Sequence, residues 1–526
     1  MDLTQFDIHI SDVDGIPDLP KIELTTGIIT LTGRNNVGKS RILRNIDKYR
    51  SIMLGERPEQ NINNLKLSVH SEINDGDLTF NVNIDRKKNS FEFASRRGSD
   101  YNIKILQEGY QVKIQTAPGG PFQTRNSSSI YLAVGPHKDF STFQQNLKRI
   151  VYVPPYRPIA DKANTILQTT ILPDGSNLCQ ILYYHKNRET EQFHEIEKVM
   201  RETFTEIENI LTVPSGNNEV TITIKDRFSG KNVSISDAGT GVAQTLLLTT
   251  MIICSEPGRI FLIDEPHVYL HPNAEKALAR FIRDHKEHYY IIATHSALLI
   301  SQLKPDVSYL VTRDKDGTKM RLLFTTAEDR EEVLSELGLD ISDIVLFESL
   351  IFVEGSSDKA IYGVLLDRLG LNELKKKSTI VDISGAGNSE PIETVLDRLG
   401  SILNIPYIIV LDGDQQGKMK GEHITFLSYR DIEDVLLLDT QAVLKAITKL
   451  IGDKDNKTGM TEEEVSKFVE EPQRKGDKGA RILNCIFQSY DTHLHYNKRK
   501  HGPMIAELID PKKLENLKNF FDGLFS

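Results

Sequence analysis

The sequence predicts an α/β protein of two domains, each built on a mainly parallel sheet with helices on its faces. In the first 325 residues, short apolar segments alternate with helical patterns, and strands are expected at 28–32, 259–263 and 289–293. The same alternation starts again after residue 346, with strands expected at 350–353, 380–383 and 407–411. Short, continuously apolar strands separated by helices are typical of doubly wound parallel sheets.

The first domain, residues 1–325, is expected to carry inserted strands and helices. Apolar residues recur at every second position from about 65 to 115, which predicts half-buried antiparallel strands. A largely helical insertion is expected at about 160–211, and we predict that it contacts a second copy of the chain. An acidic segment at 326–345 is expected to connect this domain to the second, residues 346–526, which ends in charged helices.

The composition is that of an ordinary soluble globular protein. Of the 526 residues, 39% are hydrophobic and 26% are charged, and no apolar run reaches the roughly 18–20 residues that a membrane span needs. The first residues include acids where a signal peptide would be basic. Three cysteines far apart in the chain disfavour a disulfide framework. We therefore expect a cytoplasmic protein with no membrane partner.

The loop after the strand at 28–32 predicts a nucleotide site. Residues 33–40, Gly-Arg-Asn-Asn-Val-Gly-Lys-Ser, fit the pattern G-x-x-x-x-G-K-[ST]. Glycines let backbone N–H groups approach phosphate oxygens, the lysine reaches the terminal phosphates, and the serine hydroxyl binds Mg²⁺. The residues predicted to bind ATP here are Gly33, Asn35, Asn36, Gly38, Lys39 and Ser40.

Two later strands are expected to complete this site. The strand at 259–263 is followed by Asp264 and Glu265, and the strand at 289–293 by Thr294 and His295. Ligands of open α/β sheets bind at the carboxyl ends of the strands. We expect Asp264 to hold Mg²⁺, Glu265 to polarise the attacking water, and His295 to contact the γ-phosphate.

The order of these motifs resembles the split ATPase head of the ABC and SMC-like proteins. That family has a signature loop before the Asp-Glu strand, and the segment Ser236 to Gln244 is similar to its longer form. The residues of this loop predicted to contact nucleotide are Ser236, Gly239 and Gly241. In the family the loop acts on ATP held by another subunit, so the resemblance implies a homodimer or a higher even oligomer.

A second group of acidic residues predicts a metal site in the second domain. Glu354 follows the strand at 350–353, and Asp412 and Asp414 follow the strand at 407–411. Adjacent parallel strands would bring these carboxylates to one edge of the sheet, where they repel one another unless cations lie between them. Oxygen ligands of this kind select Mg²⁺ or Mn²⁺.

This second domain resembles the Toprim domain of topoisomerases, primases and nucleases of the OLD (overcoming lysogenization defect) family. Glu354 matches the glutamate of that domain, and Asp412 and Asp414 its Asp-x-Asp motif. The resemblance adds Asp358 and Glu433 as metal ligands, with Asp434 as the alternative to Glu433. It also implies a late basic catalytic residue, for which Lys500 is the candidate and Lys478 the alternative. The order of ATPase then Toprim is what separates OLD proteins from other SMC-like ATPases.

The resulting functional prediction is an ATP-regulated, metal-dependent DNA endonuclease, and the alternative is a regulatory ATPase whose Toprim domain is catalytically silent. Because the net charge is −10, DNA would have to meet local basic clusters. The candidates are 86–88, 96–97, 375–377 and 498–500. Since such proteins occur in anti-phage systems, Gabija and retrons among them, the resemblance implies a co-encoded partner: a reverse transcriptase with its RNA and DNA, or a helicase.

Overall fold

The protein is described from a computed structural model that divides into two compact units, 1–327 and 328–526. The structure describes residues 5–13, 16–54, 65–73, 76–85, 90–97, 100–108, 111–115, 123–126, 138–156, 159–160, 162–164, 168, 170–172, 174–215, 219–324, 346–383, 405–417, 423–451, 460–470 and 477–524. The predicted connector at 326–345 and the basic cluster at 86–88 lie outside these residues. Within them, no helix is long and apolar enough to cross a membrane.

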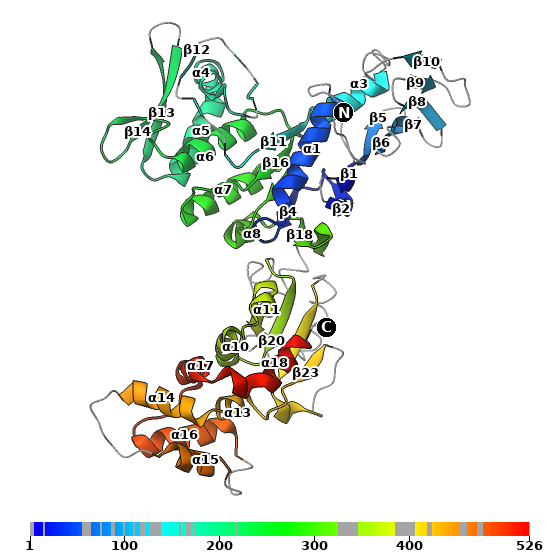
Figure 1. Ribbon diagram of the computed structural model, residues 1–526. Helices are drawn as coiled ribbons and strands as arrows, with labels where there is room; N and C mark the ends of the chain where they lie inside the picture. The colour runs from blue at the N-terminus through cyan, green and yellow to red at the C-terminus, as the bar shows by residue number, and fades with distance from the viewer. Residues whose placement is uncertain are drawn as a thin grey trace. The chain divides into compact units, whose positions relative to one another are not determined.

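The centre of the first unit is a six-stranded sheet in the order β11-β16-β17-β4-β18-β19 (Figure 1). Its strands are β4 (Ile28–Thr32), β11 (Ile150–Val153), β16 (Ile260–Asp264), β17 (Tyr289–Ala293), β18 (Val307–Asp314) and β19 (Gly317–Phe324). All neighbours run parallel except β18 and β19. Every residue of β4 and of β16 is buried, as expected for strands covered on both faces.

Helices flank this sheet. They are α1 (Lys39–Met53), α3 (Lys138–Leu147), α6 (Thr240–Ile253), α7 (Pro272–Asp284) and α8 (Ala297–Leu303). Helix α6 is mainly apolar and is buried on every face from Gly241 to Ile253. A helix of that kind has to lie inside the fold rather than on its surface, and α6 belongs to the main hydrophobic cluster of the unit.

Two further sheets are inserted in the first unit. Antiparallel strands form a nine-stranded sheet, which confirms the strands expected at 65–115. They are β1 (Gln5–Val13), β2 (Ile16–Asp18), β3 (Ile22–Glu23), β5 (Leu65–Ile73), β6 (Gly76–Asp85), β7 (Ser90–Arg97), β8 (Asp100–Glu108), β9 (Gln111–Gln115) and β10 (Gln123–Asn126).

The insertion predicted at 160–211 is helical only in its middle. Helices α4 (Leu178–Arg188) and α5 (Thr190–Thr203) are flanked by β12 (Lys162–Asn164) and β13 (Ile207–Ser215). These strands form a small sheet with β14 (Glu219–Asp226) and β15 (Asn232–Ser234). The last helix ends at Thr203, and the next segment pairs with β14 instead: Ile207 and Ile210 are both buried, on either side of a register shift between Ile207 and Asn209. Figure 1 shows α4, α5 and α6 gathered beside this sheet.

The second unit has a four-stranded parallel sheet in the order β21-β20-β22-β23. Its strands are β20 (Ser349–Val353), β21 (Ser378–Asp382), β22 (Tyr407–Leu411) and β23 (Ile424–Phe426). The chain leaves β20 for β21 on one side and later enters β22 on the other. The carboxyl ends of β20 and β22 therefore form the switch point of the sheet, which is where ligands of doubly wound folds bind.

Helices complete the second unit and share one hydrophobic cluster. They are α10 (Ser356–Arg368), α11 (Asn372–Lys377), α13 (Ile432–Leu436), α14 (Thr440–Ile451), α15 (Glu462–Glu470), α16 (Gly479–Tyr490), α17 (Lys498–Leu508) and α18 (Glu515–Asp522). Helices α10 and α17 make extensive contact with each other. This contact brings α10 against residues about 140 positions later in the chain, as the bounds of the two helices show.

Candidate functional sites

The glycine-rich loop between β4 and α1 has a backbone that only glycine can adopt at two positions. Gly33 has φ +132° and Gly38 has φ +113°, a region that residues with a Cβ avoid. A Cβ on Gly33 would lie 2.2 Å from the Val311 carbonyl oxygen, and one on Gly38 would lie 2.4 Å from the Thr318 hydroxyl oxygen. Asn36 is also left-handed, at φ 67°. The loop fits a phosphate because its backbone can approach closely.

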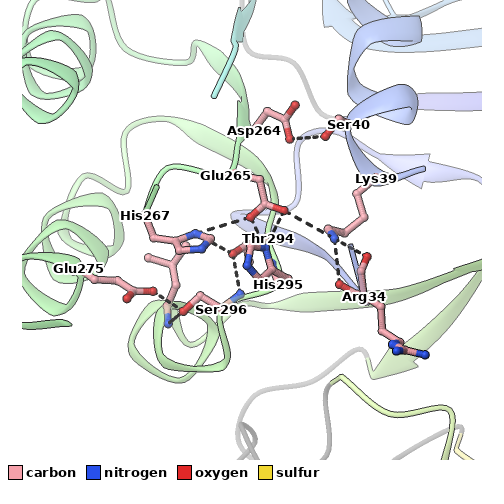
Figure 2. Close-up of polar contacts among 12 residues, drawn as sticks. Arg34, Lys39, Ser40, Asp264, Glu265, His267, Glu275, Thr294, His295 and Ser296 are labelled. Atoms are coloured by element: carbon pink, nitrogen blue, oxygen red, sulfur yellow. Dashed lines mark hydrogen bonds and ion pairs between the residues drawn. The ribbon is translucent and has the colours of Figure 1, made fainter. Parts of the chain in front are cut away.

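Lys39 is buried at the start of α1 and points back into this loop. Its Nζ donates to the carbonyl oxygens of Gly33, at 2.8 Å, and Arg34, at 2.9 Å. The same Nζ lies 3.6 Å from Glu265 Oε1 (Figure 2). Burial lowers the pKa of Lys39, and Glu265 partly offsets that effect. The ammonium is therefore held in place by the chain before any phosphate arrives.

Ser40 and Asp264 form a pair of oxygen ligands on facing elements. The Ser40 hydroxyl donates to Asp264 Oδ1 at 2.8 Å, and the Tyr152 hydroxyl donates to Oδ2 at 3.4 Å. Asp264 is 1% exposed, and its burial raises its pKa. Hydroxyl and carboxylate oxygens are ligands that Mg²⁺ accepts, so this pair fits such an ion. Tyr152, on the neighbouring strand β11, was not predicted because no motif marks it.

Glu265, the residue after β16, is contacted by His295 from the loop after β17 and by His267 from the loop after β16. Its Oε1 lies 3.1 Å from Nδ1 of His295, and its Oε2 accepts from the His295 backbone N–H at 3.3 Å. His267 Nδ1 lies 3.6 Å from Oε2 and 3.2 Å from the Thr294 hydroxyl (Figure 2). Glu265 has φ 46°, which is unusual for a residue with a side chain. The structure thus brings Lys39, Glu265 and His295 together, as expected, and adds His267.

The signature-like loop lies at the start of α6. Gly239 precedes the helix with φ 99°, and a Cβ on Gly241 would lie 2.5 Å from the Tyr269 carbonyl oxygen. The Ser236 and Ser234 hydroxyl oxygens are 2.9 Å apart. A cavity of about 570 Å³ borders the loop, lined by residues that include Gly239, Gly241, Tyr269 and His271. Neither Lys39 nor Ser40 lines this cavity, so the signature-like loop and the glycine-rich loop border different spaces within one chain.

In the second unit, the acids after β20 and β22 meet at the predicted edge. Val353 pairs with Val410 in register, and the Asp412 backbone N–H donates to Glu354 Oε1 at 3.0 Å. Asp414 lies in the turn after Asp412, Asp358 in the first turn of α10, and Glu433 in α13. A Cβ on Gly413 would lie 2.3 Å from the Tyr429 carbonyl oxygen, so this turn also needs a glycine.

The lysine that joins these acids is Lys498 and not the predicted Lys500. Lys498 Nζ lies 2.7 Å from Asp358 Oδ1 and 3.1 Å from Glu433 Oε2. Lys500 is exposed, and its described contact is the capping bond from its backbone N–H to Asn497. The alternative, Lys478, does reach the site, 2.8 Å from Asp414 Oδ2. Helix α17 begins at Lys498, and the sequence alone did not indicate which lysine of the run would face the acids.

The acid cluster carries more negative charge than its two lysines balance. Burial and then the neighbouring Glu354 raise the pKa of Asp412 to about 8. Burial raises the pKa of Glu433, which is 1% exposed, and Lys498 opposes that shift. Glu433 Oε1 is buried and has no hydrogen-bond partner among the described residues. A buried carboxylate oxygen without a donor is suited to a metal ion, so these residues fit divalent cations.

Of the other predicted basic clusters, 375–377 ends α11, where Lys375 pairs with Asp367 and Lys376 with Glu373. These ion pairs are exposed and worth little, so the lysines can exchange their partners for a phosphate.

Two family models match the chain. The AAA domain model AAA_21 matches residues 172–301, and the model described as "Overcoming lysogenization defect protein-like, TOPRIM domain" matches residues 346–414. The first match contains the signature-like loop, Asp264, Glu265 and His295. The second contains Glu354, Asp358, Asp412 and Asp414.

Curated relatives are similar over parts of the chain. The Old nuclease of Escherichia phage P2 is 29% identical over 27% of this chain and 26% of its own length. Endonuclease GajA of Bacillus cereus (strain VD045) is 23% identical over 31% of this chain and 27% of its own length. The chain thus spans about a quarter of these two relatives. The OLD nuclease of Thermus scotoductus is 22% identical over 75% of this chain and 80% of its own length.

Solved SMC head domains also align with part of the chain. The head domain from Thermotoga maritima aligns over 61% of this chain and 99% of its own, at 12% identity and a TM-score of 0.34. An Smc head bound to the C-terminal winged-helix domain of ScpA aligns over 63% of this chain and 99% of its own, at 11% identity and a TM-score of 0.38. TM-scores this low carry no argument about the fold, which is defined by the strand order given above. The chain is therefore similar to OLD nucleases: a segment that matches the AAA model is followed by one that matches the OLD-like Toprim model, and the OLD nuclease of Thermus scotoductus aligns with most of the chain.

Proposed function

We propose that this protein is an ATP-hydrolysing, divalent-metal-dependent DNA endonuclease. The observation that carries the proposal is the acid cluster of the second unit: five carboxylates, two lysines and an unpartnered buried oxygen on Glu433. An ordinary ion-pair network would balance its charges, and this one does not. The relatives named as nuclease and endonuclease support the same reading.

The residues of the cluster would divide the work of phosphodiester hydrolysis. Glu354, Asp412, Asp414, Asp358 and Glu433 would hold the divalent ions, which activate water and stabilise the leaving oxygen when bound. Lys498, which already spans Asp358 and Glu433, would keep these two carboxylates oriented and add positive charge near the scissile phosphate. Lys478 would do the same for Asp414.

The first unit would bind and hydrolyse ATP. Lys39 and the loop backbone would hold the phosphates, while Ser40 and Asp264 would hold Mg²⁺. Glu265 would orient and polarise the attacking water, and His295 would contact the γ-phosphate. The cavity beside Gly239 and Gly241 would receive nucleotide from a second copy, so we propose a homodimer or a higher even oligomer. A monomer at micromolar concentration with full ATP turnover, measured by light scattering, would contradict that assembly.

The direct test of the nuclease is cleavage of supercoiled plasmid DNA in Mg²⁺ or Mn²⁺, with and without ATP. We expect nicked and linear products that a chelator abolishes and that excess metal restores. If the purified protein cuts neither DNA nor RNA under any nucleotide condition, the alternative of a regulatory ATPase with a silent Toprim domain is favoured.

The OLD resemblance extends the proposal to anti-phage defence, acting with a co-encoded partner. Its test is phage plaquing on cells that express the natural gene neighbourhood with the wild-type chain or with Asp412→Ala. Equal plaquing on both strains would argue against a role of the nuclease in defence.

A further inference from the structure

Three potential metal ligands converge beside the glycine-rich loop, apart from the Ser40 and Asp264 pair. A carboxylate oxygen of Glu265 and one ring nitrogen each of His267 and His295 all lie within 4.8 Å of one another. Among the described residues, no other group of three or more His, Cys, Asp and Glu side chains has its ligand atoms this close together. Figure 2 shows both imidazoles turned toward the Glu265 carboxylate.

The distances match those between ligands on one ion. The His295 Nδ1 to Glu265 Oε1 distance is 3.1 Å, and the His267 Nδ1 to Glu265 Oε2 distance is 3.6 Å. Two ligands about 2.0–2.2 Å from a tetrahedral ion lie on the order of 3.3 Å apart. The two rings are 4.9 Å apart between centroids and inclined at 70°. The three ligand atoms lie within 4.8 Å of one another, so the side chains would have to move closer together to share one ion.

The surroundings both favour and oppose an ion here. His295 is 40% exposed in its side chain, which gives an ion access from solvent. Lys39 opposes a cation because its Nζ is 3.6 Å from the same carboxylate, but that ammonium is also held by two carbonyl oxygens.

The ligand type decides which metal fits. Mg²⁺ takes oxygen ligands and keeps its water, whereas two imidazoles and one carboxylate suit Zn²⁺, as in the His₂Glu sites of zinc enzymes. We propose that Glu265, His267 and His295 form a Zn²⁺ site in the nucleotide-free chain, and that the bound ion inhibits ATP hydrolysis. The inhibition rests on the proposed role of Glu265 as the catalytic carboxylate; the binding of the ion does not.

Zn²⁺ binding is tested by competition with a chromophoric chelator, in excess Mg²⁺ and without nucleotide. We compare the full-length wild-type chain with His267→Asn, which keeps a polar side chain for Thr294. The control is His194→Asn, since His194 is 73% exposed and faces a single carboxylate, Glu197, at 3.7 Å. We expect His267→Asn to lose one bound Zn²⁺ per chain or to bind it about 10–100-fold more weakly, while His194→Asn matches wild type.

His295→Gln, with the same expected loss, serves as the second variant, and circular dichroism melting identifies any variant that fails to fold. Equal Zn²⁺ stoichiometry and affinity in wild type, His267→Asn and His295→Gln would overturn the site, because the ion would then lie elsewhere, for example at the Toprim acids.

The functional half is tested by titrating Zn²⁺ into the Mg²⁺-dependent ATPase reaction of the wild-type chain. We expect Zn²⁺ to inhibit the wild-type reaction and a chelator to restore it. His267→Asn should need at least tenfold more Zn²⁺ for the same fractional loss of rate, measured relative to the rate of that variant without Zn²⁺. A wild-type ATPase that Zn²⁺ does not inhibit would overturn the inhibition while leaving the proposed function intact. A chain that hydrolyses no ATP at all would instead contradict the proposed function, and the chelator competition would still decide the site.

Discussion

Both sites hold carboxylates at the carboxyl end of a parallel sheet, but the groups that surround these carboxylates differ. In the first unit each carboxylate already has donors from the chain: Ser40 and Tyr152 for Asp264, and His295 for Glu265. In the second unit carboxylates face one another, the pKa of Asp412 is raised to about 8, and Glu433 Oε1 has no donor. The carboxylates of the first site are held by hydrogen bonds from the chain, whereas those of the second leave negative charge that the proposed divalent cations would balance.

The largest expected effect comes from removing a carboxylate of the second site. Asp412→Ala should abolish DNA cleavage, a fall of roughly 10³-fold or more, because the ions lose a ligand that no neighbour replaces. ATP hydrolysis should stay within a few-fold of wild type, since Asp412 lies in the other unit. Plasmid cleavage and phosphate release, measured on the same preparation, check this.

Asp367→Ala is the matched control, because Asp367 is an exposed aspartate on α10 paired with Lys375. It should cleave DNA like wild type. Cleavage that survives in Asp412→Ala would place the nuclease outside this cluster, and Glu354→Ala combined with Asp412→Ala should be no worse than either alone if the residues act as a unit.

The next effect tests the first site. Glu265→Gln should slow ATP hydrolysis by roughly 10²–10⁴-fold, the usual range for removing a general base. Nucleotide binding should persist, because Lys39 and the loop backbone are unchanged. Fluorescent-nucleotide titration and single-turnover hydrolysis separate the two steps, and an unchanged hydrolysis rate would reject Glu265 as the catalytic carboxylate.

A smaller effect distinguishes two lysines of one run. Lys498→Met should slow cleavage by about 10–100-fold, as expected for a residue that orients metal ligands, because it contacts Asp358 and Glu433. Lys500→Met, two residues along the same helix, should retain cleavage within about threefold of wild type. Initial rates of plasmid cleavage over a range of Mg²⁺ concentrations check both, and the reverse order of effects would restore Lys500 as the catalytic candidate.

Local sequence patterns predicted most of this architecture. Each predicted motif directly follows an apolar strand, so one short stretch of sequence contains both the strand and the functional residues. This holds for the glycine-rich loop, for Asp264 with Glu265, and for Glu354 and Asp412. Period-two apolar residues predicted the strands at 65–115 equally well. The helical insertion was predicted too long, because the spacing of three between the apolar residues 207 and 210 fits a helix. In the strand both are buried, since the pairing with β14 shifts register between Ile207 and Asn209.

Two of the residues that sequence analysis missed, Tyr152 and Lys498, lie far along the chain from the motif they serve. Tyr152 reaches Asp264 from the neighbouring strand, and Lys498 reaches Asp358 across the contact of α10 with α17. Neither has a spacing that a pattern could detect. For Lys498 a weak local signal existed: Asn497 is a good N-cap, so the helix starts at Lys498, but the partner of its side chain depends on tertiary packing.

The smallest expected effect concerns how the glycine-rich loop is held in place before nucleotide binds. Thr318, fully buried on β19, donates from its hydroxyl to the Val37 carbonyl oxygen at 2.8 Å and also fills the space beside Gly38. Thr318→Val keeps the volume and removes one hydrogen bond, worth about 1 kcal/mol. We expect the KM for ATP to rise about fivefold with little change in kcat, because the loop would have to be ordered by the ligand while Glu265 and Asp264 stay in place. Steady-state ATPase kinetics measure both constants, with Thr312→Val on the adjacent strand as the control. A fall in kcat at unchanged KM would mean instead that Thr318 acts on the chemical step, and the first site would then be less fully organised in advance than its contacts indicate.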